Sequence, residues 1–414
     1  MFNEIFERPH ATERQINAPL LEDRLRYLTY RAEQEIARTV LREIAIYQLI
    51  VIKYLKLKDD NHIFTVKEIQ QAAQRWAQRK TRRLKEDSFI IRKKRFIKLA
   101  KNWLQFLGRL KIQEQFIPSQ VTEFIDYMRK EQNLCEATIY CRRSQLQRFF
   151  GQINEDPGQF LKHLAPARLD AIQIQKLHHG VYSRSTIQNC ATTLRAFFRY
   201  AEGQGWCRRG IADSIQAPRV YKHATLPSSP TWEDVQRLLK TTEGNRPSSI
   251  RARAIILLLA VYGLRASEVR RLCLDDFDWE QETFRLKHSK FGPRQQFPLV
   301  QTVGRALIKY IKEVRPQRSP YREIFLTLRA PFIPMNTLFG TVSLRWKPLN
   351  VAIKNHGPHS LRHACATRLI NQGMSLKTIA DQLGHRNLET TRIYAKVDLT
   401  RLREVANFDL RGVL

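Results

Sequence analysis

Residues 359–367 run His-Ser-Leu-Arg-His-Ala-Cys-Ala-Thr, and this stretch decides how the rest of the sequence is interpreted. The pattern predicts a helix on which His359 and Arg362 project from one face, because residues three apart are neighbours on a helix. A histidine and an arginine at this spacing occur on many ordinary helices, so the pair has no functional meaning alone. Three other segments of the same region indicate a function for this pair.

The first of these segments is Gly263-Leu-Arg-Ala-Ser-Glu268, which follows an apolar helix predicted over residues 250–262. Gly263 ends that helix, and Arg265 presents a guanidinium where the next predicted helix, 266–274, begins. Glu268 lies one turn further on, where its carboxylate can orient the guanidinium. An arginine is therefore expected in a fixed position at a helix N-terminus.

A lysine, a histidine and a tyrosine complete the pattern. Lys290 lies in the turn of a β-hairpin predicted for residues 283–287 and 295–300, from which a mobile cation can enter a DNA groove. Leu383-Gly-His385 is followed, nine residues later, by Tyr394. Each segment alone is common. All four in this order are specific, because the probability that they occur together by chance is the product of four separate probabilities.

In their order and spacing these segments resemble those of the tyrosine recombinase, or phage integrase, family of site-specific DNA recombinases. The resemblance covers about residues 118–400. Counting back from Phe297-Pro-Leu299 places Lys290 at the family's hairpin lysine, although the turn Ser289-Lys-Phe-Gly-Pro293 lacks the usual glycine before the lysine. The segment before residue 118 is longer than in minimal members.

The resemblance implies an enzyme that cleaves and rejoins DNA without a metal or ATP. Tyr394 would attack a DNA phosphorus, form a 3′-phosphotyrosine and free a 5′-hydroxyl, and strand exchange would pass through a Holliday junction. Physical chemistry supports these roles, because Arg265 and Arg362 can grip the nonbridging oxygens and His385 can add a donor. Lys290 would protonate the leaving oxygen, and His359 would assist proton transfer or positioning. The cations would also lower the pKa of the phenol.

Three alternatives stay open. Integration, excision or transposition of a mobile element is favoured over chromosome or plasmid dimer resolution because of the long N-terminal extension. A type IB topoisomerase uses similar chemistry, but the helical domain before the linker and the tail after Tyr394 favour a recombinase. A DNA-binding accessory protein without catalysis would usually have lost one of the residues named above, and here all six are present.

The pattern of elements predicts a mainly helical fold with one small β-sheet, and the resemblance implies that its domains close as a C-shaped clamp on DNA. Polar residues that favour helix N-caps predict helix starts at Thr65, Ser119 and Ser183. The predicted parts are a helical N-terminal extension serving DNA arm binding or assembly (1–117), a helical, SAM-like core-binding domain (118–215), an extended linker (216–230), an α+β catalytic domain (231–398) and a C-terminal tail (399–414). We expect the tail to dock on a neighbouring protomer, with packing on its own domain as the alternative.

Charge indicates the partner. Lys and Arg number 71 against 39 Asp and Glu, a net charge of +32, and basic residues occur in every segment. Such a spread favours a wrapped nucleic acid, and the resemblance implies that it is double-stranded DNA with an inverted-repeat core site. By resemblance, four copies assemble on synapsed DNA, alone or with related recombinases. The helix faces expected to contact DNA grooves carry Arg142, Arg143, Arg148, Arg184, Arg195 and Arg199.

Cysteines and apolar runs point to the cytoplasm. The six cysteines form no C-x-x-C pair and only Cys365 has a close histidine, so neither a zinc site nor a disulfide framework is predicted. Asp275, Asp276 and Asp278 suggest the polar end of a helix rather than a two-metal site. The longest apolar stretch, 254–262, is too short to span a bilayer, so no membrane partner is expected.

Overall fold

The computed structural model describes residues 1–58, 60, 62–78, 86–111, 117–169, 183–219, 229–286 and 295–384, with the backbone alone at 86–88. Lys290, His385 and Tyr394 lie outside these residues, as do most of the predicted linker and the whole tail 399–414. Within the described chain the expected mainly helical fold with small sheets is confirmed.

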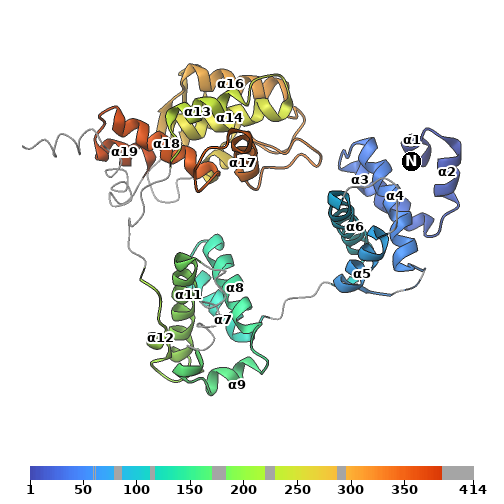
Figure 1. The fold of residues 1–414 in the computed structure, drawn as a ribbon, viewed down its shortest axis with the longest axis horizontal. Coiled ribbons are helices and arrows are strands. Elements are labelled where there is room, and N and C mark those ends of the chain that lie inside the picture. Colours follow the sequence, from blue (N-terminus) through green and yellow to red (C-terminus); the bar gives the residue numbers. More distant parts are fainter. Residues whose placement is uncertain are drawn as a thin grey trace, which may run out of the picture. The chain divides into compact units, whose positions relative to one another are not determined.

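The N-terminal helices, blue in Figure 1, surround a core of their own that includes Trp76, Phe96 and Trp103. Helices α4, α5 and α6 pack against one another within this N-terminal bundle, which is the name used below for residues 1–111. A two-stranded ribbon, absent from the sequence prediction, joins β1 to β2. The elements are α1 (Phe2–Ile5), α2 (Pro9–Ile16), α3 (Leu21–Glu33), α4 (Arg38–Leu55), β1 (Phe64–Thr65), α5 (Val66–Ala77), α6 (Glu86–Phe106) and β2 (Leu110–Lys111).

Residues 111–224 contain a second compact unit with an aromatic core. Phe149 and Phe198 meet edge to face at 6.1 Å, and Phe150 and Phe197 at 5.5 Å, geometries that aromatic rings favour. The elements are α7 (Ser119–Lys130), α8 (Glu136–Phe150), α9 (Pro157–Lys162), α11 (Arg184–Gly203) and α12 (Ile211–Ser214).

Two of the three predicted N-caps are confirmed. The hydroxyl of Thr65 accepts a hydrogen bond from the backbone N–H of Glu68 at 3.3 Å, and that of Ser183 accepts one from Thr186 at 3.2 Å. The prediction for Ser119 is wrong: it is the first residue of α7, Pro118 holds the cap position, and the Ser119 hydroxyl bonds the side chain of Gln120.

The third core is built around α14 (Pro247–Val261), which is apolar on all sides and packs against α16 and α18. A three-stranded antiparallel sheet lies in the order β3-β4-β5, with Phe284 opposite Phe297. The hairpin was predicted; the edge strand β3 was not. The elements are α13 (Trp232–Lys240), α14, α15 (Ala266–Arg271), β3 (Phe277–Asp278), β4 (Thr283–Leu286), β5 (Gln295–Pro298), α16 (Gln301–Glu313), α17 (Phe339–Trp346), α18 (Pro358–Asn371) and α19 (Leu376–Leu383).

Helix α15 ends at Arg271, earlier than the predicted 274, because Leu272 and Cys273 are extended, and a short 3-10 turn over Leu274–Asp276 follows them. The carboxylate of Asp276 accepts a hydrogen bond from the backbone N–H of Cys273 at 2.8 Å, and Asp275 pairs with Arg322. These aspartates therefore shape the turn into the sheet. No helix in the described ranges is long and apolar enough to cross a bilayer.

Candidate active site

The turn between α14 and α15 positions Arg265. Gly263 adopts a left-handed conformation, φ +65°, and a Cβ there would come within 2.5 Å of the Leu383 side chain. Glycine is thus required both for the conformation and for the close approach of α19. Two residues later the chain is extended at Arg265, which is the N-cap of α15, as the sequence predicted.

Glu268 orients Arg265 in the expected way. Its Oε1 lies 2.7 Å from Nη1 of Arg265, and its Oε2 accepts a hydrogen bond from the Arg265 backbone N–H at 2.8 Å. The Glu268 side chain is 5% exposed and that of Arg265 is 24% exposed. A buried carboxylate therefore fixes a guanidinium whose edge still reaches solvent.

Arg362 reaches the same place from α18. It is 5% exposed and donates hydrogen bonds from Nη1 to the Gly263 carbonyl at 2.6 Å and from Nη2 to the Leu383 carbonyl at 2.7 Å. Arg265 donates from Nη2 to the next carbonyl, that of Gly384, at 2.8 Å. The two guanidiniums thus hold consecutive carbonyls at the end of α19, where helical carbonyls have no partner in the helix and cations are favoured.

His359 lies in the first turn of the same helix as Arg362 and is solvent-accessible. Partial burial lowers the pKa of its imidazole, and the nearby charges of Arg362 and Arg265 lower it further. A lowered pKa keeps the ring neutral near pH 7, so that it can accept a proton. His363, one turn along α18, also has a lowered pKa, caused by burial and then by His359 and Arg362. Its spacing of four from His359 is the signal that could have marked it as a neighbour of the site.

The hairpin strand β5 is attached to this cluster at both of its ends. At the start, Gln295 donates from Nε2 to the Asp381 carbonyl at 2.6 Å, near the end of α19. At the other end, the Tyr262 hydroxyl donates to the Pro298 carbonyl at 2.8 Å and accepts from the Val300 N–H at 2.8 Å. The strand that leads away from the predicted lysine turn is therefore anchored beside α19. Neither Gln295 nor Tyr262 was predicted to take part, and no local sequence pattern marks them.

The structure thus brings together Arg265 and Glu268 with His359 and Arg362, two stretches of chain that meet at the end of α19, a third stretch. The described residues end at Gly384, whose carbonyl accepts from Arg265, one residue before His385. Across the described residues no three His, Cys, Asp or Glu side chains cluster as metal ligands. The two guanidiniums gathered here bind anions, and the neutral imidazole of His359 can donate or accept a hydrogen bond beside them.

Comparison with known proteins identifies the family. The sequence profile described as "Phage integrase family" matches residues 231–401. The chain is 37% identical to "Putative integrase/recombinase y4gC" of Sinorhizobium fredii over 176 residues, 42% of this chain and 91% of that protein. It is also 30% identical to "Tyrosine recombinase XerD" of Listeria innocua over 231 residues, 54% of this chain and 75% of that protein. The chain belongs to the phage integrase family of tyrosine recombinases.

Other members of the family are matched over less of their length or at lower identity. The chain is 37% identical to "Putative integrase/recombinase y4rA" of Sinorhizobium fredii over 218 residues, 52% of this chain but only 53% of that protein. Among solved structures, the Tn1549 transposon integrase (residues 82–397), in complex with circular intermediate DNA, superimposes with a TM-score of 0.52 at 21% identity. That match covers 66% of this chain and 94% of the other, and shows a shared fold.

The arginines expected to contact DNA grooves differ in how far they are engaged inside this family member. Arg143, Arg148, Arg184 and Arg199 are exposed on α8 and α11. Two of these exposed arginines also have internal partners, Arg148 the Ser144 carbonyl and Arg199 the carboxylate of Asp213. Arg195 donates from both Nε and Nη2 to the Ile215 carbonyl, at 3.1 and 2.6 Å, so it fastens α11 to the end of α12. Arg142, half-buried, contacts the Met128 sulfur.

Proposed function

We propose that this chain is a site-specific recombinase that cuts and rejoins DNA strands through a covalent link to Tyr394. The observation that carries the proposal is the convergence of Arg265 and Arg362 on the carbonyls of Leu383 and Gly384. Two guanidiniums from distant stretches, fixed side by side, suit a phosphodiester, whose single negative charge increases to two when a nucleophile attacks the phosphorus. Family membership supports the same assignment.

The arginines would act by preorganised electrostatic stabilisation. Each guanidinium carries further N–H donors beyond those directed to the carbonyls and to Glu268, and these would bind the nonbridging oxygens of the scissile phosphate. Because Glu268 and the backbone hold both groups in place beforehand, little reorganisation is needed as negative charge grows at phosphorus. His359, neutral near pH 7, would accept or relay a proton beside the phosphate.

The residues outside the described chain complete the reaction. The Tyr394 oxygen would form a bond to phosphorus while the bond from phosphorus to the 5′ oxygen breaks, and Lys290 would give that oxygen its proton. His385 would add a donor to a nonbridging oxygen. The 5′-hydroxyl of another strand then attacks the phosphotyrosine and releases the phenol. Phosphodiester energy is conserved in the linkage, so the reaction consumes no ATP and uses no cofactor.

The DNA partner and the role are part of the same proposal. The net charge of +32 favours a duplex wrapped by the domains predicted at 118–215 and 231–398, joined by the linker 216–230. We propose inverted-repeat sites, a tetramer on synapsed DNA, and the integration, excision or transposition of a mobile element. The names of two relatives at 37% identity, both integrase/recombinase, support the mobile-element role.

A nicked suicide duplex tests the proposal, because the short leaving fragment diffuses away and traps the covalent intermediate. Such duplexes would be tiled across the DNA that flanks the gene. We expect a protein–DNA band that resists denaturation. Tyr394→Phe should abolish this band without loss of DNA binding. Tyr321→Phe, a matched control at an exposed tyrosine, should leave the band unchanged. DNA binding without any band would indicate an accessory protein. A band with plasmid relaxation but no exchange between two sites would indicate a topoisomerase.

A further inference from the structure

Helix α5 of the N-terminal bundle has an outward face made of long polar side chains. Its inner face is buried through Ile69, Ala72, Ala73, Trp76 and Ala77. The opposite face carries, at the helical spacing of three and four, Lys67, Gln70, Gln71, Gln74 and Arg75. None of these side chains belongs to the cleavage site, and bundle packing does not require glutamines there.

This face borders a groove of about 540 Å³ between α5 and α6, completed by Lys93 of α6. Among the described residues, the lining consists of three cations and three glutamines and includes no carboxylate. Lys93 donates a hydrogen bond to Oε1 of Gln74, and the amide NH₂ of Gln74 makes no hydrogen bond to the other described residues. Lys67, Gln70 and Gln71 make no side-chain hydrogen bond within the described part of the chain.

The rest of α6 adds positive charge beside the groove. From Phe89 to Phe106 it has no acidic residue, and its basic residues are Arg92, Lys93, Lys94, Arg95, Lys98 and Lys101. Arg95 pairs with Glu43, and the guanidinium of Arg92 lies 4.8 Å from the ring centre of Trp76. Lys94 and Lys98 are exposed. The charge of this surface is complementary to a polyanion.

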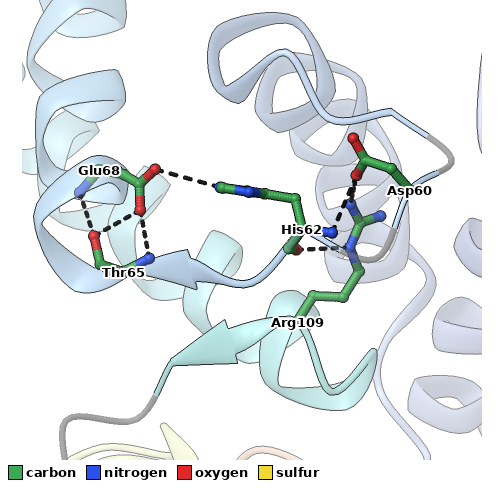
Figure 2. Close-up of polar contacts among 5 residues, drawn as sticks. All are labelled: Asp60, His62, Thr65, Glu68 and Arg109. Carbon is green, nitrogen blue, oxygen red and sulfur yellow. Dashed lines mark hydrogen bonds and ion pairs between the residues drawn. The ribbon is translucent and has the colours of Figure 1, made fainter.

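A polar network holds the start of α5 in a fixed orientation (Figure 2). Oε2 of Glu68 accepts a hydrogen bond from the Thr65 backbone N–H at 2.7 Å, and Oε1 lies 3.4 Å from Nε2 of His62. Arg109, 9% exposed, donates to the His62 carbonyl at 3.2 Å and pairs with Asp60 at 2.6 Å. The helix is therefore presented by a rigid support, as sequence-reading helices require.

We propose that α5 is a DNA-reading helix, whose outward face enters the major groove of duplex DNA. The major groove accepts an α-helix; glutamine amides pair with the N6 and N7 edge of adenine, and lysine and arginine bind guanine edges or phosphates. Cations alone would suit any polyanion, but the amides of Gln70 and Gln71, which make no side-chain hydrogen bond within the described residues, match the donors and acceptors of base edges. Duplex DNA is thus favoured over an acidic protein surface. This inference goes beyond the proposed cleavage function and stands independently of it.

Binding selection from a pool of randomised duplexes tests the proposal with the full chain. The wild-type chain is expected to enrich a motif that the triple variant Gln70→Ala/Gln71→Ala/Gln74→Ala does not. The affinity of that variant for the motif should fall by about 10-fold or more, while its affinity for random duplex stays the same. Lys67→Ala/Arg75→Ala should instead weaken binding to every duplex and reduce the slope of log affinity against log salt by about 1.8.

Arg14→Ala/Lys53→Ala is the matched control, because both residues are exposed on other helices of the N-terminal bundle and neither lines the groove. It should enrich the wild-type motifs. A cooperative melting transition within a few degrees of the wild type would establish that each variant is folded, since Gln74 alone among the changed residues is half-buried. If the triple variant and the wild type enrich the same motifs with equal affinity, the proposal is overturned. Because binding rather than cleavage is measured, failure of the cleavage proposal leaves this result interpretable.

Discussion

The cleavage site and the outward face of α5 use basic and polar side chains in opposite ways. Arg265 and Arg362 are largely buried, and their guanidiniums are already bonded to Glu268 and to backbone carbonyls. Lys67 and Gln71 are exposed and make no side-chain hydrogen bond in the described chain. Stabilising a transition state requires groups fixed in advance, whereas reading base edges requires donors and acceptors that are still available to DNA. The cleavage site therefore holds both of its arginines by internal bonds, whereas on the α5 face Lys67 makes none in the described chain and Arg75 makes one, to the Tyr54 carbonyl.

Arg362→Ala should give the largest effect. It removes a proposed phosphate ligand and leaves the buried carbonyls of Gly263 and Leu383 without this donor. We expect strand cleavage to fall by at least about 10³-fold and the free energy of unfolding to fall by about 2–5 kcal/mol. Cleavage of the suicide duplex and denaturant unfolding measure the two effects.

Arg368→Ala is the control, since this arginine lies on the same helix but stacks on Trp232, 3.8 Å from its ring centre. It should cost about 1 kcal/mol and leave the cleavage rate nearly unchanged. Equal losses of rate in the two variants would mean that the internal bonds of Arg362 do not mark it as catalytic.

Glu268→Ala should have the next largest effect, because it removes the carboxylate that orients Arg265. We expect the rate of cleavage to fall by roughly 10- to 100-fold, because misplacing a catalytic group slows the reaction. The free energy of unfolding should fall by about 1–3 kcal/mol. Glu268→Gln keeps the shape and can still accept the Arg265 backbone hydrogen bond, so it should recover part of both. If Glu268→Ala retained full activity, Arg265 would not depend on prior orientation.

A smaller effect is expected from pH. The pKa of His359 is lower in the folded chain than its ordinary value of 6.5. As the pH falls below about 6.5, the unfolded chain binds a proton that the folded chain does not, so the free energy of unfolding decreases until the folded pKa is passed. His359→Gln should make unfolding less sensitive to pH between 7.5 and 5.5. His363 shifts in the same direction and should account for part of the remaining dependence. If unfolding of the variant had the same pH dependence as the wild type, the pKa of His359 would not be lowered in the folded chain.

The smallest effect is expected on the α5 face. Gln70→Ala/Gln71→Ala/Gln74→Ala changes two exposed side chains and the half-buried Gln74, which accepts a hydrogen bond from Lys93, so stability should fall by no more than about 1 kcal/mol. Cleavage of a suicide duplex that carries only the core site should also be unchanged. A large loss of stability in thermal unfolding would show that this face is structural rather than available to DNA.

The sequence predicted the contacts of the site and of the fold that depend on local spacing. In the site, Glu268 lies one turn from Arg265, and in the N-terminal bundle Thr65 caps α5, because helical geometry fixes such contacts. The carbonyl partners of Arg362 could not be predicted, since Gly263 lies 99 residues away in the sequence and its carbonyl has no side-chain signature. For the same reason the role of Gln295, which donates to a carbonyl 86 residues away, could not be predicted. Strand β3 was missed because a strand of two residues shows no periodic pattern.

The central claim is that Tyr394 is the nucleophile that attacks a DNA phosphate bound by Arg265 and Arg362. Peptide mapping by mass spectrometry of the covalent adduct formed on a suicide duplex tests it most directly. We predict a nucleotide linked through a 3′-phosphate to the peptide that contains Tyr394, with loss of the adduct in Arg265→Ala and Arg362→Ala. An adduct on another residue, or one that persists without both arginines, would contradict the account.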